Sequence, residues 1–244
     1  LDQLSEARLL GLQRPNPLDL LREGSVRRPR LAPASTRLIR QARERVLDLG
    51  CAEGATLVHV DAGPGTVGLD IFEAKLAFAR KQLPHVEIVQ GSAYELPFAD
   101  GRFDHVLVRD VIHHLDEPER AVREIRRVLS PGGRVDVLET CGRTPLVFLH
   151  ATTNKVERGE PRSPPAYLRE LFGRELEVEI VERFQAMPIH RVVFHPKLGR
   201  PALGAAPRVA GLVEAFERAA AKLVPEALWA YIHLRATVPS KPGR

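Results

Sequence analysis

The chain has 244 residues, of which 44% are hydrophobic and 27% charged, with a formal net charge of +5 at pH 7. This balance excludes a disordered or fibrous protein and fits a globular chain with one large core. No apolar run reaches the roughly 18–20 residues of a membrane span and no secretory leader opens the sequence, so we expect a soluble, cytoplasmic protein. Two cysteines, Cys51 and Cys141, are too few for a disulfide framework and lack zinc-site spacing, so no metal site is predicted.

Residues 1–44 are predicted to form an N-terminal cap or extension. Four prolines in this stretch exclude one long helix. Residues 1–45 carry ten arginines against five acidic residues, and the run Arg27-Arg28-Pro29-Arg30 could contact phosphates. We favour the simpler interpretation, a solvated extension, because the basic excess is confined to this segment.

A core over residues 45–141 is predicted from five short apolar runs, which read as buried strands at 46–50, 67–71, 86–89, 105–108 and 135–138. Helical patterns lie between them, with Leu76, Ala79 and Leu83 on one face of the first. In the second helix Val122, Ile125 and Leu129 share a face. Asp116 and Glu119 are spaced as a capping box at its start, with Pro118 in its first turn. The alternation predicts an α/β, doubly wound, mainly parallel sheet that binds ligands at the carboxyl ends of its strands.

Residues 142–244 are predicted to complete the sheet and to supply a cover for the substrate. A polar, proline-containing stretch at 142–166 precedes a short helix around 167–172, and strands are expected at 177–181 and 228–238. Between these strands an apolar stripe, including Leu212, Phe216 and Leu223, marks one face of a helix. We interpret the stripe as core-facing, with a substrate lid as the alternative.

The strongest functional signal is the run VLDLGCAEG at 46–54, followed sixteen residues after Gly54 by Asp70 at the end of the second strand. Gly50 and Gly54 allow a ligand to approach the backbone of the strand-to-helix turn. An acidic residue ending the second strand can accept hydrogen bonds from both hydroxyls of a ribose. Together the two signals predict an adenosine-containing ligand. A dinucleotide is disfavoured because the turn lacks the G-x-G-x-x-G pattern.

The arrangement resembles the class I S-adenosylmethionine-dependent methyltransferases, particularly the small-molecule group that includes quinone-pathway enzymes. The resemblance spans about residues 45–140. Besides the glycine turn and Asp70, it rests on GSAYELPF at 91–98, Phe103-Asp104, Ile112-His113-His114-Leu115 and the run LSPGG at 129–133. It implies a Rossmann-like, seven-stranded sheet whose last strand is antiparallel, with S-adenosyl-L-methionine as methyl donor and S-adenosyl-L-homocysteine as product.

The resemblance also implies roles for individual residues. The turn from Asp48 to Gly54, including Gly50, Cys51 and Glu53, would hold the methionine part. Asp70 would bind the ribose, Ile71 one face of the adenine, and Ser92 with Ala93 the adenine edge. Arg109 would lie near the sulfonium, beside Asp110. The sequence departs from the family pattern at two positions, where Ala52 replaces the middle glycine and Ser92 replaces the usual acid.

Methyl transfer is an in-line displacement that depends mainly on positioning, and a base is needed only for a protonated acceptor. Candidates for that base at the strand ends are Asp110, His113, His114 and Glu139, of which we favour the two histidines. A small-molecule acceptor is expected, whereas neither the acceptor itself nor the oligomeric state can be read from the sequence.

Two alternative functions remain open, a nucleic-acid methyltransferase and a non-catalytic cofactor-binding subunit. A nucleic-acid substrate is disfavoured because residues 109–112 lack the Asn/Asp-Pro-Pro-aromatic run and neither cysteine follows a proline. A catechol-type metal site would need an Asp-Asn pair, and the only asparagines are Asn16 and Asn154.

Overall fold

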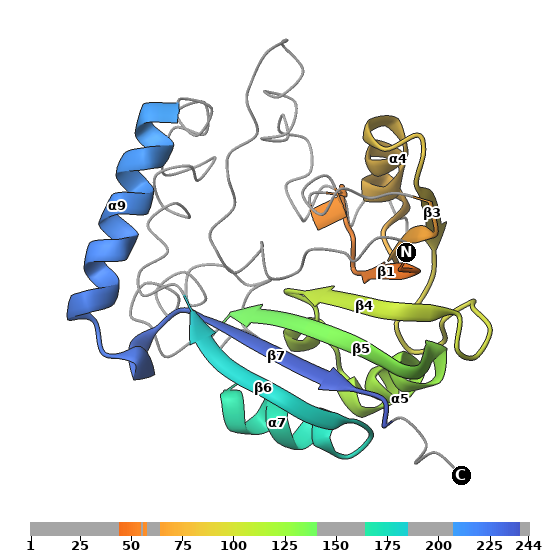
Figure 1. Ribbon diagram of the computed structural model, residues 1–244. Helices are drawn as coiled ribbons and strands as arrows, with labels where there is room; N and C mark the ends of the chain where they lie inside the picture. The colour runs from red at the N-terminus through yellow and green to blue at the C-terminus, as the bar shows by residue number, and fades with distance from the viewer. Residues whose placement is uncertain (1–43, 55, 58–63, 141–163, 185–206, 240–244) are drawn as a thin grey trace.

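A seven-stranded sheet in the order β3-β2-β1-β4-β5-β7-β6 is the centre of the computed structural model, which describes residues 44–54, 56–57, 64–140, 164–184 and 207–239 (Figure 1). The parallel strands are β1 (Val46–Leu49), β2 (Thr66–Asp70), β3 (Glu87–Gln90), β4 (Phe103–Arg109) and β5 (Leu129–Thr140). Strand β7 (Tyr231–Thr237) lies antiparallel between β5 and β6 (Glu177–Phe184). The predicted Rossmann-like sheet with an antiparallel last strand is confirmed.

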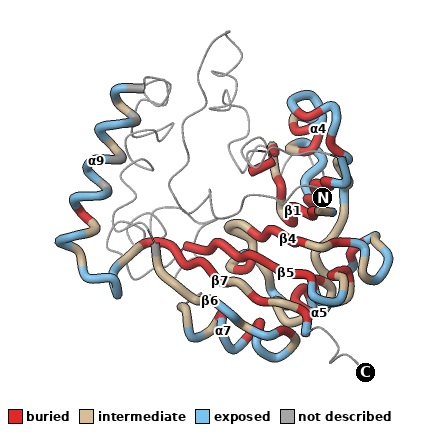
Figure 2. The backbone as a smooth tube through the Cα atoms, viewed as in Figure 1, coloured by how far each residue is buried: buried red, intermediate tan, exposed pale blue. Residues whose placement is uncertain are grey.

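Helices cover both faces of the sheet. Helix α4 (Glu73–Gln82) packs Leu76 and Leu83 against one face, in a cluster with Val46 of β1. On the other face, α5 (Pro118–Val128) and α7 (Pro165–Gly173) contribute to the larger core cluster. Strands β1 and β2 are buried along their whole length, as expected for parallel strands covered on two sides (Figure 2). Leu76 and Ala79 of α4, and Val122 and Ile125 of α5, are buried as expected, whereas Leu83 and Leu129 are buried just beyond the ends of the two helices.

The start of α5 differs from the sequence expectation. Its N-cap is Glu117, no side chain caps the helix, and Pro118 occupies the first turn as predicted. The predicted capping box of Asp116 and Glu119 is therefore wrong. The hydroxyl of Tyr94 instead accepts hydrogen bonds from the backbone amides of Asp116, at 2.9 Å, and Glu117, at 3.3 Å.

Two predictions for the region after residue 141 also need correction. Along α9 (Pro207–Leu223), Leu212 is 70% exposed, Phe216 44% and Leu223 84%, so most of the large apolar side chains of the stripe do not face a core, although Ala220 is buried (Figure 2). Helix α7 was expected within a substrate cover, but Leu168, Leu171 and Phe172 are buried in the larger core cluster. The 3-10 turn η6 (Glu226–Leu228) leads into β7.

The other parts of the predicted cover, the cap over residues 1–43 and the stretch 142–163, lie outside the described residues. Within the described ranges, no helix is both long enough and apolar enough to cross a bilayer.

A charged network is buried between β4, β5 and β7. The side chain of Asp136 is fully buried and accepts hydrogen bonds from His105 Nε2 at 2.8 Å, His233 Nε2 at 2.7 Å and Arg235 Nε at 2.9 Å. Burial alone would raise the pKa of Asp136, but these hydrogen bonds hold it well below its usual range. The network therefore links the parallel half of the sheet to the antiparallel strand.

Candidate functional site

The turn after β1 has a backbone that favours glycine. Gly50, Ala52 and Gly54 have φ angles of 78°, 47° and 85°, in the left-handed region. A Cβ at Gly50 would lie 2.3 Å from Cγ2 of Val111, and one at Gly54 would lie 2.8 Å from Cδ1 of Leu83. The alanine that departs from the family pattern thus occupies a conformation that costs a non-glycine residue about 1–2 kcal/mol.

Asp70 joins this turn to the end of β2. Its Oδ2 accepts a hydrogen bond from the backbone amide of Ala52 at 3.0 Å, and its Oδ1 accepts one from that of Phe72 at 2.9 Å. Each carboxylate oxygen has two lone pairs, so both oxygens keep one acceptor position for a ligand. Ile71, the next residue, is 58% exposed, although it is a large apolar side chain beside a polar site.

Asp48, near the end of β1, is a buried carboxyl group in an unfavourable environment. Asp48 is 1% exposed, and neither oxygen of its carboxyl group has a hydrogen-bond partner within the described part of the chain. Burial raises the pKa of Asp48 to about 7; the charge of Arg109 opposes this shift and that of Asp70 adds to it. A ligand with a positive group would compensate for this desolvated carboxyl group.

The other residues predicted to bind the cofactor differ in their burial and in their contacts. The thiol of Cys51 packs in the core cluster with Leu57, and burial raises its pKa, while its backbone amide donates to the carbonyl of Leu69 at 3.0 Å. Glu53 is partly exposed within the turn. Ser92 Oγ accepts a hydrogen bond from the backbone amide of Tyr94 at 3.2 Å, and Ala93 packs against the larger core cluster.

The segment after β4 brings the remaining predicted residues to the neighbouring strand end. Asp110 has a left-handed φ of 52°, and its backbone amide donates to the carbonyl of Leu138 at 2.8 Å. Arg109 Nε lies 3.7 Å from Asp110 Oδ2. The 3-10 turn η2 (Ile112–His114) follows, and the rings of His113 and His114 have centroids 3.9 Å apart.

Glu139, at the end of β5, holds this segment in place. Its Oε1 accepts hydrogen bonds from the backbone amides of Val111 and Ile112, and its Oε2 lies 2.6 Å from Nδ1 of His113. Sequence reasoning named Glu139 only as a candidate base. Its hydrogen bonds to the loop had no signal in the sequence beyond its place at a strand end.

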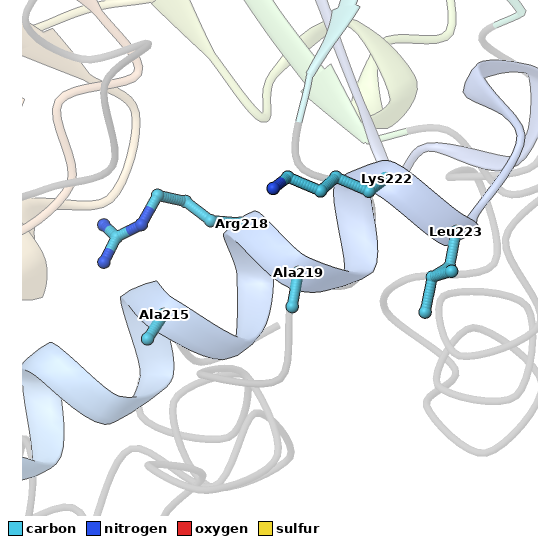
Figure 3. Close-up of a pocket in the computed structure, with 5 residues that line it drawn as sticks. All are labelled: Ala215, Arg218, Ala219, Lys222 and Leu223. Carbon is cyan, nitrogen blue, oxygen red and sulfur yellow. The ribbon is translucent and has the colours of Figure 1, made fainter.

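The predicted residues thus lie at or just after the carboxyl ends of β3, β2, β1, β4 and β5, which are consecutive in the sheet. A hollow beside α9 does not coincide with this site. It is lined by Ala215, Arg218, Ala219, Lys222 and Leu223, all from one helix, and includes none of the predicted residues (Figure 3). The acidic groups and the glycine turn suit the binding of an adenosine ligand. The two histidines at the adjoining strand end suit proton transfer.

Comparison with known proteins agrees with this geometry. Residues 47–136 match the model of the Methyltransferase domain family, which covers the glycine turn, Asp70 and the histidine pair. Residues 47–136 therefore form a methyltransferase domain that is similar to S-adenosylmethionine-dependent methyltransferases.

Two curated relatives match part of the chain around this domain. One, from Mycolicibacterium smegmatis, is named "Probable S-adenosylmethionine-dependent methyltransferase" and is 36% identical over 148 residues, 59% of this chain and 52% of the relative. Another, a demethylmenaquinone methyltransferase of Renibacterium salmoninarum, is 35% identical over 97 residues, 39% of this chain and 41% of the relative. The chain thus spans about half or less of these curated relatives.

A solved structure shares the fold of this chain. An S-adenosylmethionine-dependent methyltransferase of Thermotoga maritima, titled a "possible histamine N-methyltransferase", has a TM-score of 0.59 at 21% identity. The match covers 84% of this chain and 85% of that one. At this identity the likeness shows a shared fold and leaves the acceptor undetermined.

Proposed function

We propose that this protein transfers a methyl group from S-adenosyl-L-methionine to a small-molecule acceptor. The observation that carries the proposal is the pairing of Asp70 with the glycine turn, beside the buried and unpartnered carboxyl group of Asp48. The residues fit the methyl donor because Asp70 offers acceptors to a ribose and Asp48 suits a positive group.

The chain's own residues would position the reactants rather than form a covalent intermediate. The bound donor supplies a methyl group on a sulfonium sulfur, which is already a good leaving group. The turn over residues 48–54 would bind the methionine part and Arg109 would lie near the sulfonium. An acceptor with an O–H or N–H group would give its proton to His113 or His114, which follow β4 beside the site.

Support for a small-molecule acceptor comes from the relatives rather than from a pocket in the described residues. Demethylmenaquinone is the first acceptor to assay, because a relative named for that reaction is 35% identical over 97 residues. If a base is used, His113→Ala or His114→Ala should lower turnover by about 10² to 10⁴ with little change in donor affinity. Unchanged turnover in both variants would leave catalysis to positioning alone.

The proposal is tested by the affinity for S-adenosyl-L-homocysteine, measured by calorimetry. Asp70→Ala should weaken binding at least about tenfold, because a hydrogen bond to a charged group contributes about 1.5–3 kcal/mol. Asp104→Ala is the matched control, since Asp104 is a hydrogen-bonded carboxyl group at the start of β4 that contacts Arg45. Equal affinities for wild type and Asp70→Ala would refute the ribose assignment. Binding by wild type without methyl transfer to any acceptor would favour the non-catalytic alternative.

A further inference from the structure

Glu139, near the end of β5, and His113, in the segment after β4, form a buried pair. Both side chains are almost inaccessible, with exposures of 0% and 1%, and Oε2 lies 2.6 Å from Nδ1. The other oxygen, Oε1, accepts the backbone amides of Val111 at 2.8 Å and Ile112 at 2.7 Å. Because Oε1 already has two N–H donors, Oε2 is the oxygen that meets the imidazole ring.

This arrangement decides which ring nitrogen carries the proton. When Glu139 is ionised, its carboxylate can only accept hydrogen bonds, so Nδ1 donates and a neutral ring then has its lone pair on Nε2. Burial raises the pKa of Glu139, while the contact with His113 and the amide of Ile112 oppose that shift. The charge of Asp110 adds to the rise, and the ring of His114 lies against that of His113.

We propose that Glu139 is a positioning residue that holds His113 in the Nδ1–H tautomer and leaves Nε2 as its basic nitrogen. The inference rests on the proposed function, in which a histidine receives the acceptor's proton. In that step the acceptor's O–H or N–H bond breaks, its proton goes to Nε2, and the methyl group passes from sulfur to the acceptor atom. The positive charge moves from the sulfonium to the imidazolium, beside the carboxylate of Glu139.

The tautomer of His113 can be measured directly, without knowing the acceptor. In the full chain labelled with ¹⁵N-histidine, long-range ¹H–¹⁵N spectra distinguish the two tautomers, and loss of a signal set in His113→Ala assigns the ring. Wild type should show the proton on Nδ1. In Glu139→Gln the side-chain oxygen still accepts from Val111 and Ile112, so its NH₂ group faces Nδ1 and the proton should move to Nε2.

Glu124→Gln is the matched control, because Glu124 also accepts a backbone amide, that of Leu96 at 2.8 Å, but does not contact His113. It should leave the tautomer of His113 unchanged. A wild-type ring with its proton on Nε2 overturns the proposal even if Glu139→Gln does not fold, and so does an unchanged tautomer in a folded Glu139→Gln. Calorimetry with S-adenosyl-L-homocysteine on wild type separates the two ideas, since absent binding refutes the proposed function and leaves the tautomer result standing.

Discussion

At the scale of single residues, Asp48 and Asp70 are two carboxyl groups at neighbouring strand ends with opposite environments. Asp70 accepts two backbone amides, from Ala52 and Phe72, and so holds the glycine turn against the end of β2. Asp48 is buried without a hydrogen-bond partner among the described residues. Such a group destabilises the ligand-free chain, and strain of this kind concentrates at binding sites.

The pKa of Asp48 leads to a prediction about stability and pH. Because burial raises this pKa to about 7, the folded chain binds a proton that the unfolded chain has released above about pH 4. Asp48 therefore lowers the free energy of unfolding progressively from about pH 4 to pH 7, by on the order of 2–4 kcal/mol. Asp48→Asn removes this pH-dependent loss. In urea unfolding without ligand, the free energy of unfolding of the variant minus that of wild type should therefore increase between pH 5 and pH 8.

The control for this measurement is Asp104→Asn. The hydrogen bonds from Arg45 hold the pKa of Asp104 well below its usual range, so Asp104 does not titrate between pH 5 and pH 8. The difference in free energy of unfolding between Asp104→Asn and wild type should therefore be the same at pH 5 and pH 8. An Asp48→Asn chain that behaves in the same way would show that Asp48 is ionised throughout that range.

At the scale of elements, the loop between β3 and β4 is fixed by α5. The hydroxyl of Tyr94 accepts the amides of Asp116 and Glu117 just before the helix, Glu124 accepts the amide of Leu96, and Arg127 donates to the carbonyls of Leu96 and Phe98. The loop carries Ser92 and Ala93, the predicted contacts of the adenine edge. Helix α5 therefore positions that part of the site from the far side of the loop.

Removing the hydroxyl of Tyr94 tests this coupling. Tyr94→Phe deprives the amides of Asp116 and Glu117 of their acceptor and should lower the free energy of unfolding by about 1 kcal/mol. Urea unfolding measures the loss. Tyr167→Phe in α7 is the control, because the hydroxyl of Tyr167 has no hydrogen bond in the described ranges, and its stability should change by less. Equal losses in the two variants would contradict a stabilising role for the hydrogen bonds of the Tyr94 hydroxyl.

The same elements show what the sequence could predict. Strands β1, β2, β4 and β5 were predictable because buried parallel strands are continuous apolar runs, and the turn with Asp70 because its glycines and acid have a fixed spacing. The hydrogen bonds just before α5 could not be predicted, because the backbone amide of Asp116 donates to the hydroxyl of Tyr94, which lies 22 residues earlier in the chain. The stripe on α9 predicted an amphipathic helix correctly, but periodicity does not reveal what covers an apolar face.

At the scale of the whole molecule, Asp136 links both halves of the sheet. It meets His105 of β4, and His233 and Arg235 of β7, so one carboxylate joins three strands. Removing one partner of a buried charged group leaves the others without compensation, which makes such networks costly to break.

Asp136→Asn is therefore expected to lower the free energy of unfolding by about 3 kcal/mol or more at pH 7. Because the pKa of Asp136 is held low in the folded chain, its contribution is present above about pH 4 and is lost as the pH falls further. The deficit of the variant in urea unfolding should accordingly shrink below pH 4. The exposed pair of Arg45 and Asp104 is the comparison, and Asp104→Asn should cost about 1 kcal/mol or less at pH 7. Similar costs at the two positions would contradict this account.

The place of β7 between β5 and β6 also has a consequence for synthesis on the ribosome. Within the described ranges, β6 pairs only with β7, and β7 follows it by nearly fifty residues, so this pairing waits until Tyr231–Thr237 has emerged. During that interval the nascent chain presents two open strand edges, one on β5 and one on β6, and such edges promote association between chains. Chaperone dependence during translation should therefore be greatest between the synthesis of β6 and that of β7.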